Sequence, residues 1–215
     1  TSADITPPLI SITSPINGSV IKDPTYLSAV TNENAVCKYN TSKTFNFSLS
    51  SSRFNESGNT THSINLGTLG DGQKTYFIKC NDSQGNINND DNQANTTFIV
   101  DDTSPSIALN FPGNNSNVTS AIVNFNWTAT DVVDVNLSCN LTVNGNILGS
   151  NVFSPSGVQT NRTIIVPSGL NRWNVTCIDD VSNKGYSVNH EFTYKLIESV
   201  TSIQTVNASY KFSKN

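Results

Sequence analysis

The sequence is short of several residue types, and each shortage excludes a class of protein. It contains no Met and only two His, and just 13% of its residues are charged, so amphipathic helices have little material. No apolar run approaches the roughly 20 residues that a bilayer-spanning helix needs. Lys and Arg are few and dispersed, and the net charge is −4. We therefore expect no membrane insertion of this segment and no nucleic-acid partner.

Polar β-formers and turn formers take the place of helix formers. The 215 residues include 32 Asn, 28 Ser and 24 Thr. Because Ser, Thr and Asn compete for backbone hydrogen bonds, they suit strands and turns better than helices. The chain opens on Thr1, without a basic-then-apolar leader, which indicates a mature form or an excised ectodomain whose anchor, if any, lies elsewhere.

Two stretches of the chain repeat the same landmarks. Each opens on Thr-x-Pro-x-Ile, at residues 6–10 and 103–107. Each later contains Gly-x-x-x-aromatic-x-x-x-Cys, at 72–80 and 169–177, and then an acidic turn. The offset is 97 residues at both the Gly and the Cys. A shared register of this kind indicates an internal duplication.

Apolar and polar residues alternate in seven short runs per repeat, which predicts an all-β fold of two tandem immunoglobulin-like (Ig-like) β-sandwiches. We expect domains at residues 1–101 and 102–197, set end to end as a rod because Pro105 stiffens the linker at 101–105. The predicted strands are 9–13, 26–31, 35–41, 45–50, 62–66, 74–81 and 95–100, then 106–111, 121–130, 134–143, 147–153, 160–166, 171–178 and 188–196.

Three motifs carry a resemblance to a known group of proteins. They are the Thr-x-Pro-x-Ile segments, the Pro-x-Asn-x-Ser turns at 15–19 and 112–116, and Asp-x-x-Gly-Asn at 82–86. Through them, residues 6–196 resemble the tandem Ig-like repeats of prokaryotic, especially archaeal, cell-surface proteins. The motifs are mostly turn chemistry, so the resemblance implies an architecture and an extracellular location rather than an activity.

Each repeat contains two cysteines, and four cysteines allow three pairings. The duplication favours Cys37 with Cys80 and Cys139 with Cys177, since one geometry then serves both copies. These pairs join the third and sixth predicted strands, whereas antibody domains join the second and sixth across the sheets. The alternative is four buried thiols in a cytosolic protein. Disulfides favour an extracellular location.

Acceptor triplets for N-linked glycans, Asn-x-Ser/Thr, occur at about twice the frequency that composition predicts. Asn126, between Phe125 and Trp127, and Asn174, between Trp173 and Val175, should point outward if their neighbours point inward. The same parity applies to Asn46 and Asn140. The 15 predicted acceptors are Asn17, Asn40, Asn46, Asn55, Asn59, Asn81, Asn95, Asn114, Asn117, Asn126, Asn136, Asn140, Asn161, Asn174 and Asn207.

No pattern in the sequence indicates catalysis. His62 and His190 stand in no metal or nucleophile motif, and we expect both to be solvated strand residues. Tyr76 and Trp173 should pack on the disulfides. We expect no enzyme, and no cofactor beyond N-linked glycans.

Four groups of acidic residues lack the ordered spacing of a calcium loop, so the sequence predicts no metal site. A structural calcium ion stays open as an alternative to solvated turn acids, with Asp101 and Asp102 best placed at the linker. The groups are Asp90-Asp91, Asp101-Asp102, Asp131 with Asp134, and Asp179-Asp180.

The last residues, 198–215, have no counterpart in the first repeat. Alternation over 206–212 predicts one more strand, which must pair with something because a lone strand is unstable. It could start a third domain, extend its own sheet, or be donated to a neighbouring copy. We favour donation, in which Val206, Ala208, Tyr210 and Phe212 contact the next copy.

The leading hypothesis is therefore structural. We expect a subunit of an extracellular, N-glycosylated filament or pilus-like appendage, whose partners are copies of itself in a heterologous, propagating contact. The alternative is the adhesive or glycan-binding ectodomain of a larger cell-surface protein, which exposed aromatic residues on loops would favour. A third possibility is the accessory sandwich of an enzyme.

Overall fold

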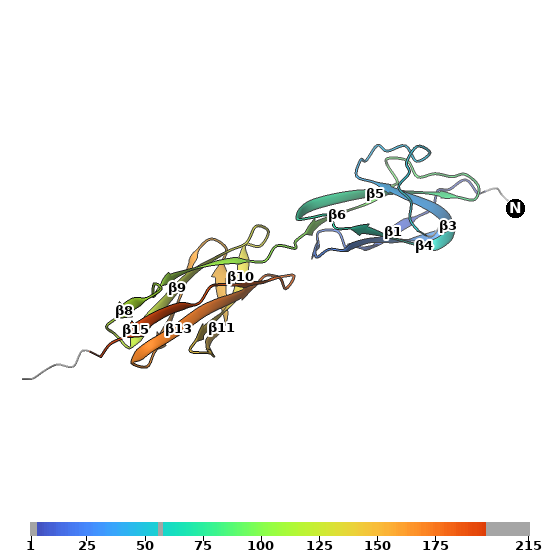
Figure 1. Ribbon diagram of the computed structural model, residues 1–215. Helices are drawn as coiled ribbons and strands as arrows, with labels where there is room; N and C mark the ends of the chain where they lie inside the picture. Colours follow the sequence, from blue (N-terminus) through green and yellow to red (C-terminus); the bar gives the residue numbers. More distant parts are fainter. Residues whose placement is uncertain (1–3, 56–57, 197–215) are drawn as a thin grey trace, which may run out of the picture.

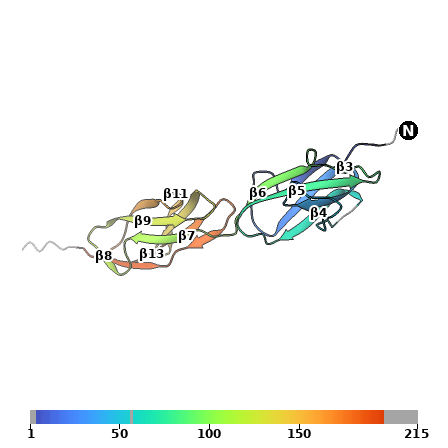
Figure 2. The same cartoon turned by 90° about the horizontal axis from the view of Figure 1, so that it is seen from above.

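The computed structural model describes residues 4–55 and 58–196. Within these ranges the chain is all-β, as the sequence predicts, and contains no helix. Accordingly, the described part holds no helix of the length and hydropathy that a bilayer crossing requires. Two sandwiches lie end to end (Figures 1 and 2). The strand-free segment 101–105 joins them, and the predicted boundary falls inside it.

The first sandwich consists of six strands: β1 (Ile10–Ser14), β2 (Val20–Ile21), β3 (Thr25–Asn40), β4 (Asn59–Gly67), β5 (Gly72–Asp82) and β6 (Ala94–Val100). β3 takes part in both layers, because its first half pairs with β1 and β4 and its second half with β5. The sequence predicts two strands here, but no Gly or Pro interrupts the run, which continues as one strand with a register shift between Val30 and Ala35.

The second sandwich consists of nine strands: β7 (Ser106–Phe111), β8 (Ser116–Val118), β9 (Ile122–Thr130), β10 (Asn136–Val143), β11 (Asn146–Pro155), β12 (Gln159–Ile165), β13 (Gly169–Ile178), β14 (Lys184–Tyr186) and β15 (His190–Tyr194). One sheet has the order β12-β9-β7, and the other has the order β11-β10-β13-β15-β8, with β14 on β13. In both domains a short strand after the first pairs in parallel with the last, β2 with β6 and β8 with β15.

Each domain has its own hydrophobic core, built from the inward-facing residues of its strands. In the second domain the Phe125 ring forms T-shaped pairs with Trp173 and Phe192, whose ring centroids lie 5.1 and 5.7 Å from its own. The Trp173 indole N–H donates to the Pro112 carbonyl, so its polar atom is satisfied inside the core. In the first domain Tyr76 stacks on Phe98 at 6.1 Å. Burial of each such side chain contributes about 1.5–3 kcal/mol.

Both disulfides join neighbouring strands of one sheet. Cys37 and Cys80 are directly opposite on β3 and β5, with Cα atoms 4.1 Å apart. Cys139 and Cys177 are opposite on β10 and β13, at 4.0 Å. These are the pairs that the duplication favours. Unlike the antibody disulfide, which bridges two sheets, each connects two strands of a single sheet, and its cysteines are part of the core.

Residues 45–50, predicted as a strand, form turns instead. Asn46 accepts a hydrogen bond from the Ser48 backbone N–H at 2.9 Å, and this local bond competes with strand pairing. Phe45 is still buried, where it covers the Lys79 ammonium group.

The prediction of a solvated His62 is wrong. His62 lies on β4 opposite Ala29 and is only 2% exposed. Its Nε2 atom lies 3.0 Å from the Thr31 hydroxyl, and its ring meets the edge of Phe54. The inward face of β4 therefore carries the imidazole ring of His62, which contacts the buried Thr31 hydroxyl. His190 is partly buried beside Trp173.

Candidate functional site at the domain junction

The linker between the two sandwiches is held by hydrogen bonds from the first domain. The Asp101 backbone N–H donates to the Ile21 carbonyl at 2.9 Å, which extends the β2–β6 pairing by one residue. The Asp102 N–H donates to the Asp71 carboxylate at 2.7 Å, and the Asp23 N–H donates to the Asp102 carboxylate at 3.1 Å. The Thr103 hydroxyl also donates to Asp71. Hydrogen bonds from Thr103 and Asp102 lower the pKa of Asp71.

The second domain holds the same linker from the other side. The Asn183 side-chain amide donates to the Asp101 carbonyl at 3.1 Å in a buried position. Gly185 of β14 packs so closely on the linker that a Cβ atom there would lie 1.8 Å from the Pro105 carbonyl oxygen. Only glycine fits at that distance. The linker is therefore packed into both domains.

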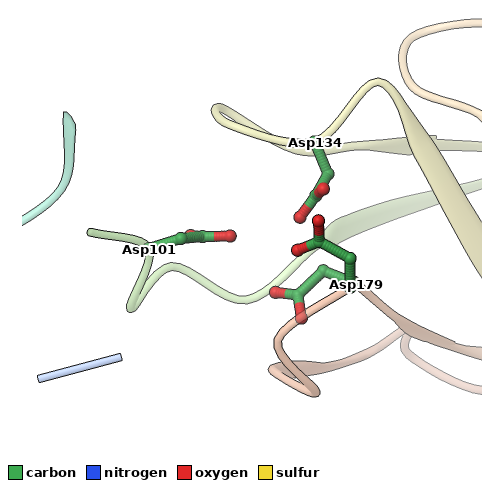
Figure 3. Close-up of side chains that lie close together, drawn as sticks. Asp101, Asp134 and Asp179 are labelled. Carbon is green, nitrogen blue, oxygen red and sulfur yellow. The ribbon is translucent and has the colours of Figure 1, made fainter. Parts of the chain in front are cut away.

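Acidic side chains from three separate segments converge at this junction (Figure 3). Asp101 follows β6, Asp134 lies in the β9–β10 loop, and Asp179 and Asp180 follow β13. One carboxylate oxygen of each of the four acids lies within 4.8 Å of all the others. In Figure 3 the carboxylates of Asp101, Asp134 and Asp179 point toward a common space.

Three of the four acids have a buried carboxylate oxygen to which no N–H or hydroxyl group donates. Asp101 is 0% exposed and Asp179 is 6% exposed. The Oδ1 atom of Asp101 accepts from the Thr103 N–H and that of Asp179 from the Asn183 N–H. The Oδ2 atoms of Asp101, Asp134 and Asp179 are buried and receive no hydrogen bond while the acids are ionised; Asp101 and Asp134 hydrogen-bond to each other only when one of them is protonated. Such groups are costly unless something compensates them.

The electrostatics of the cluster are unfavourable for ionised carboxylates. Burial first, and then the neighbouring charge of Asp180 and a side-chain hydrogen bond with Asp101, raise the pKa of Asp134 to about 7. Burial also raises the pKa of Asp101. The ion pairs of the described residues, Lys79–Asp90 and Arg172–Glu191, do not involve the cluster. Chemically, four such oxygens can share protons or hold a cation.

The first domain repeats this arrangement in a more solvated form. Asp4, Glu33 and Asp82 also bring carboxylate oxygens within 4.8 Å of one another. Asp4 and Asp82 precede Asp101 and Asp179 by 97 residues, the offset of the duplication. Here, however, Asp4 is exposed, and both oxygens of Asp82 accept hydrogen bonds from the turn that follows it.

Sequence reasoning identified these acids only as separate pairs. Asp102 hydrogen-bonds to the first domain, and Asp90 pairs with the buried Lys79 at 2.5 Å. Asp131 accepts backbone hydrogen bonds within its own loop. The signal that could have indicated the cluster is the recurrence of Asp4 and Asp82 at 101 and 179.

None of the 14 acceptor asparagines of the described residues is a buried residue, although the Oδ1 atoms of Asn81 and Asn126 are themselves buried. Asn126, Asn140 and Asn174 are partly exposed between buried neighbours, as strand parity predicts. Asn126 and Asn161 are directly opposite on β9 and β12. Asn40 and Asn81 are also partly exposed. The fully exposed acceptors are Asn17, Asn46, Asn55, Asn59, Asn95, Asn114, Asn117, Asn136 and Asn161.

Asn207 and the predicted contact residues Val206, Ala208, Tyr210 and Phe212 lie outside the described residues.

Comparison with known proteins finds similar folds only. No protein-family model matches the sequence, and no curated protein matches it. The fibronectin(III)-like modules of Clostridium thermocellum CbhA superpose with a TM-score of 0.45 at 14% identity, over 87% of this chain and 94% of that chain. The D00-D0 domain of Intimin gives 0.37 at 11%, over 86% and 99%. Tandem Ig repeats of Dlar give 0.30 at 10%, over 89% and 99%. At these values nothing about function follows from the neighbours.

Proposed function

We propose that this chain is a structural module of an extracellular, N-glycosylated surface assembly, in which it acts as a stiff rod. The observation that carries the proposal is the junction: Asp71 and Asp23 of the first domain and Asn183 and Gly185 of the second all contact the five-residue linker. A two-domain spacer holds its two ends at a fixed separation only if the linker between the domains is rigid. Here the linker forms hydrogen bonds with both domains.

Two further features support an extracellular location. Both domains carry a disulfide in the core, which is typical of proteins from oxidising compartments. The acceptor asparagines are accessible on the outer faces of both sheets of the second domain, at Asn126 and Asn161 on one and Asn140 and Asn174 on the other. Bulky glycans there would face solvent without disturbing the core.

In the finer form of this proposal the chain is a filament subunit, assembled when the segment 198–215 of one copy pairs with a strand of the next. In both described sandwiches the last strand, β6 or β15, has hydrogen-bonded neighbours on each side. A donated strand would thus add to a free edge. β11 lies at the end of its sheet and has such a free edge, and its own residues Ile147 and Phe153 are exposed. A contact between two different surfaces propagates into a filament.

Electron microscopy of three variants tests the filament. The full chain should form filaments, and deletion of 198–215 should abolish them while leaving the circular dichroism of the sandwiches unchanged. Phe153→Lys on the proposed acceptor edge should weaken assembly, and Tyr186→Lys, at an exposed position on β14, serves as its control. Filaments that persist after the deletion, or a full chain that stays monomeric up to its solubility limit, would contradict the proposal.

The adhesive alternative finds less support. Exposed aromatic residues on loops would favour it, but the large exposed aromatic side chains of the described residues all lie on strands, far apart in sequence: Tyr26, Phe111, Phe153 and Tyr186.

A further inference from the structure

We propose that the junction between the two domains is a calcium site formed by Asp101, Asp134, Asp179 and Asp180. The site is independent of any filament role, since it lies within a single chain. It joins the linker, the β9–β10 loop and the β13–β14 turn.

The spacing of the oxygens fits a single bound Ca²⁺ ion. Ca²⁺ binds oxygen ligands at about 2.3–2.6 Å, so two oxygens on opposite sides of one ion are at most about 5 Å apart. One oxygen from each of the four acids lies within 4.8 Å of all the others. All four can therefore belong to one coordination shell, which water and carbonyl oxygens would complete to six to eight ligands.

The state of the individual oxygens also favours a cation. Asp101 is 0% exposed, and its carboxylate forms a hydrogen bond with that of Asp134 only when one of the two acids is protonated. The Oδ2 atom of Asp179, a residue that is 6% exposed, is buried and has no hydrogen-bond partner. In both residues Oδ1 is fixed by a backbone N–H, which orients the second oxygen toward the shared space (Figure 3). A bound cation would contact the Oδ2 atom of Asp179 and would replace the proton between Asp101 and Asp134.

The ligand set favours Ca²⁺ over other ions. Mg²⁺ demands near-ideal octahedral geometry at about 2.0–2.1 Å and is usually held by one or two carboxylates. Here up to four carboxylates converge from three separate segments, and no His or Cys is part of the group. Many hard oxygen ligands in an irregular arrangement favour Ca²⁺ over Mg²⁺ and over softer metals.

The duplication supplies a matched control inside the same chain. Asp4, Glu33 and Asp82 repeat the arrangement, but Asp4 is exposed and both Asp82 oxygens are hydrogen-bonded. We therefore place the ion at the junction and not at the first domain.

Isothermal titration calorimetry on the full chain, after removal of metals with EDTA, tests the site. We expect one Ca²⁺ per chain with a Kd of about 10⁻⁴–10⁻³ M, the range of extracellular calcium modules. Asp134→Asn should weaken binding at least tenfold, and Glu33→Gln in the first domain should not change it. Equal binding of Mg²⁺ would overturn the assignment to calcium.

Thermal unfolding followed by tryptophan fluorescence gives an independent readout, because both Trp residues lie in the second domain. Calcium should raise the Tm of the parent and of Glu33→Gln, but not of Asp134→Asn. Asp180 is exposed, so Asp180→Asn should fold normally and bind calcium more weakly even if Asp134→Asn does not fold. No heat and no Tm shift in a folded parent, or an Asp180→Asn variant with parental affinity, would overturn the proposal.

Discussion

The side-chain amide of Asn183 donates to the backbone carbonyl of Asp101 at 3.1 Å, and Asn86 makes the same bond to Asp4 at 3.2 Å. Both pairs are related by the 97-residue offset, so the duplication preserved one contact in two settings. Between the domains the contact is buried, and in the first domain it is exposed. This bond ties the β13–β14 turn to the linker.

The difference in burial predicts different costs for the same substitution. Asn183→Ala leaves a buried carbonyl without its donor and should destabilise the second domain by about 1–3 kcal/mol. Asn86→Ala removes a bond to a carbonyl that water can reach, and should cost the first domain less. Urea unfolding, followed by tryptophan fluorescence for the second domain and by amide NMR peaks for the first, measures both. Equal losses would contradict the buried role of Asn183.

The contact of Gly185 with the linker predicts that alanine is not tolerated there. A Cβ atom would meet the Pro105 carbonyl at 1.8 Å, and a backbone atom cannot move away cheaply. We expect Gly185→Ala to destabilise the second domain by about 1–3 kcal/mol and to shift the NMR signals of 101–105. Gly113→Ala is the control, because its Cβ would meet nothing within 4 Å. A Gly185→Ala chain as stable as Gly113→Ala would show that the linker is not packed on β14.

Asp23 predicts a pH dependence of the first domain. Burial alone would raise the pKa of Asp23, but hydrogen bonds from Thr25, Gly70 and Leu69 outweigh it and lower the pKa. The folded-state pKa is thus below the unfolded value of about 3.9. The stabilisation is therefore complete above about pH 4 and is lost as the pH falls through the folded-state pKa.

Comparing the parent with Asp23→Asn measures this effect. At pH 7 the variant should be less stable by about 1–3 kcal/mol, since it loses charge-assisted hydrogen bonds. The difference should shrink toward about pH 2, where the parent carboxyl is protonated too. Urea titrations followed by the amide NMR peaks of β5 report on the first domain. A difference that is constant between these pH values would contradict the role of the charged form.

The disulfides predict nearly equal, separable losses of stability. The closed loops span 43 and 38 residues, so chain entropy gives about 4 kcal/mol for each. Replacing Cys139 and Cys177 by Ala should lower the free energy of unfolding seen by tryptophan fluorescence by that amount. Replacing Cys37 and Cys80 should leave the fluorescence transition almost unchanged, because both Trp residues lie in the second domain. A shift of the tryptophan transition in the latter variant would mean that the two domains unfold together.

Local patterns predicted much of the fold. The common offset placed Cys37 opposite Cys80 and Cys139 opposite Cys177, and Asn126 and Asn174 are partly exposed between buried neighbours. β2, β8 and β14 were missed because two or three residues show no periodicity. The prediction for His62 was wrong although strand parity puts His62 on the same face of β4 as Ile64 and Leu66, which pack against the core.

The acidic cluster could not be read from spacing alone. Asp101, Asp134 and Asp179 are brought together by the packing of the linker on two loops of the second domain. The sequence favours the pair Asp101 and Asp102 because it lies at the linker, and only the fold shows that Asp101 meets acids of two other pairs whereas Asp90 pairs with Lys79.

Residual dipolar couplings on the isotope-labelled chain test most directly whether the two sandwiches form one stiff rod. If the linker contacts of Asp71, Asn183 and Gly185 fix the junction, one alignment tensor will fit the backbone couplings of both domains in the parent chain. In Gly185→Ala the two domains will then need two different tensors. If the tensors of the two domains differ in magnitude in the parent chain, in calcium as well as in EDTA, the domains move independently and the structural role proposed here is wrong.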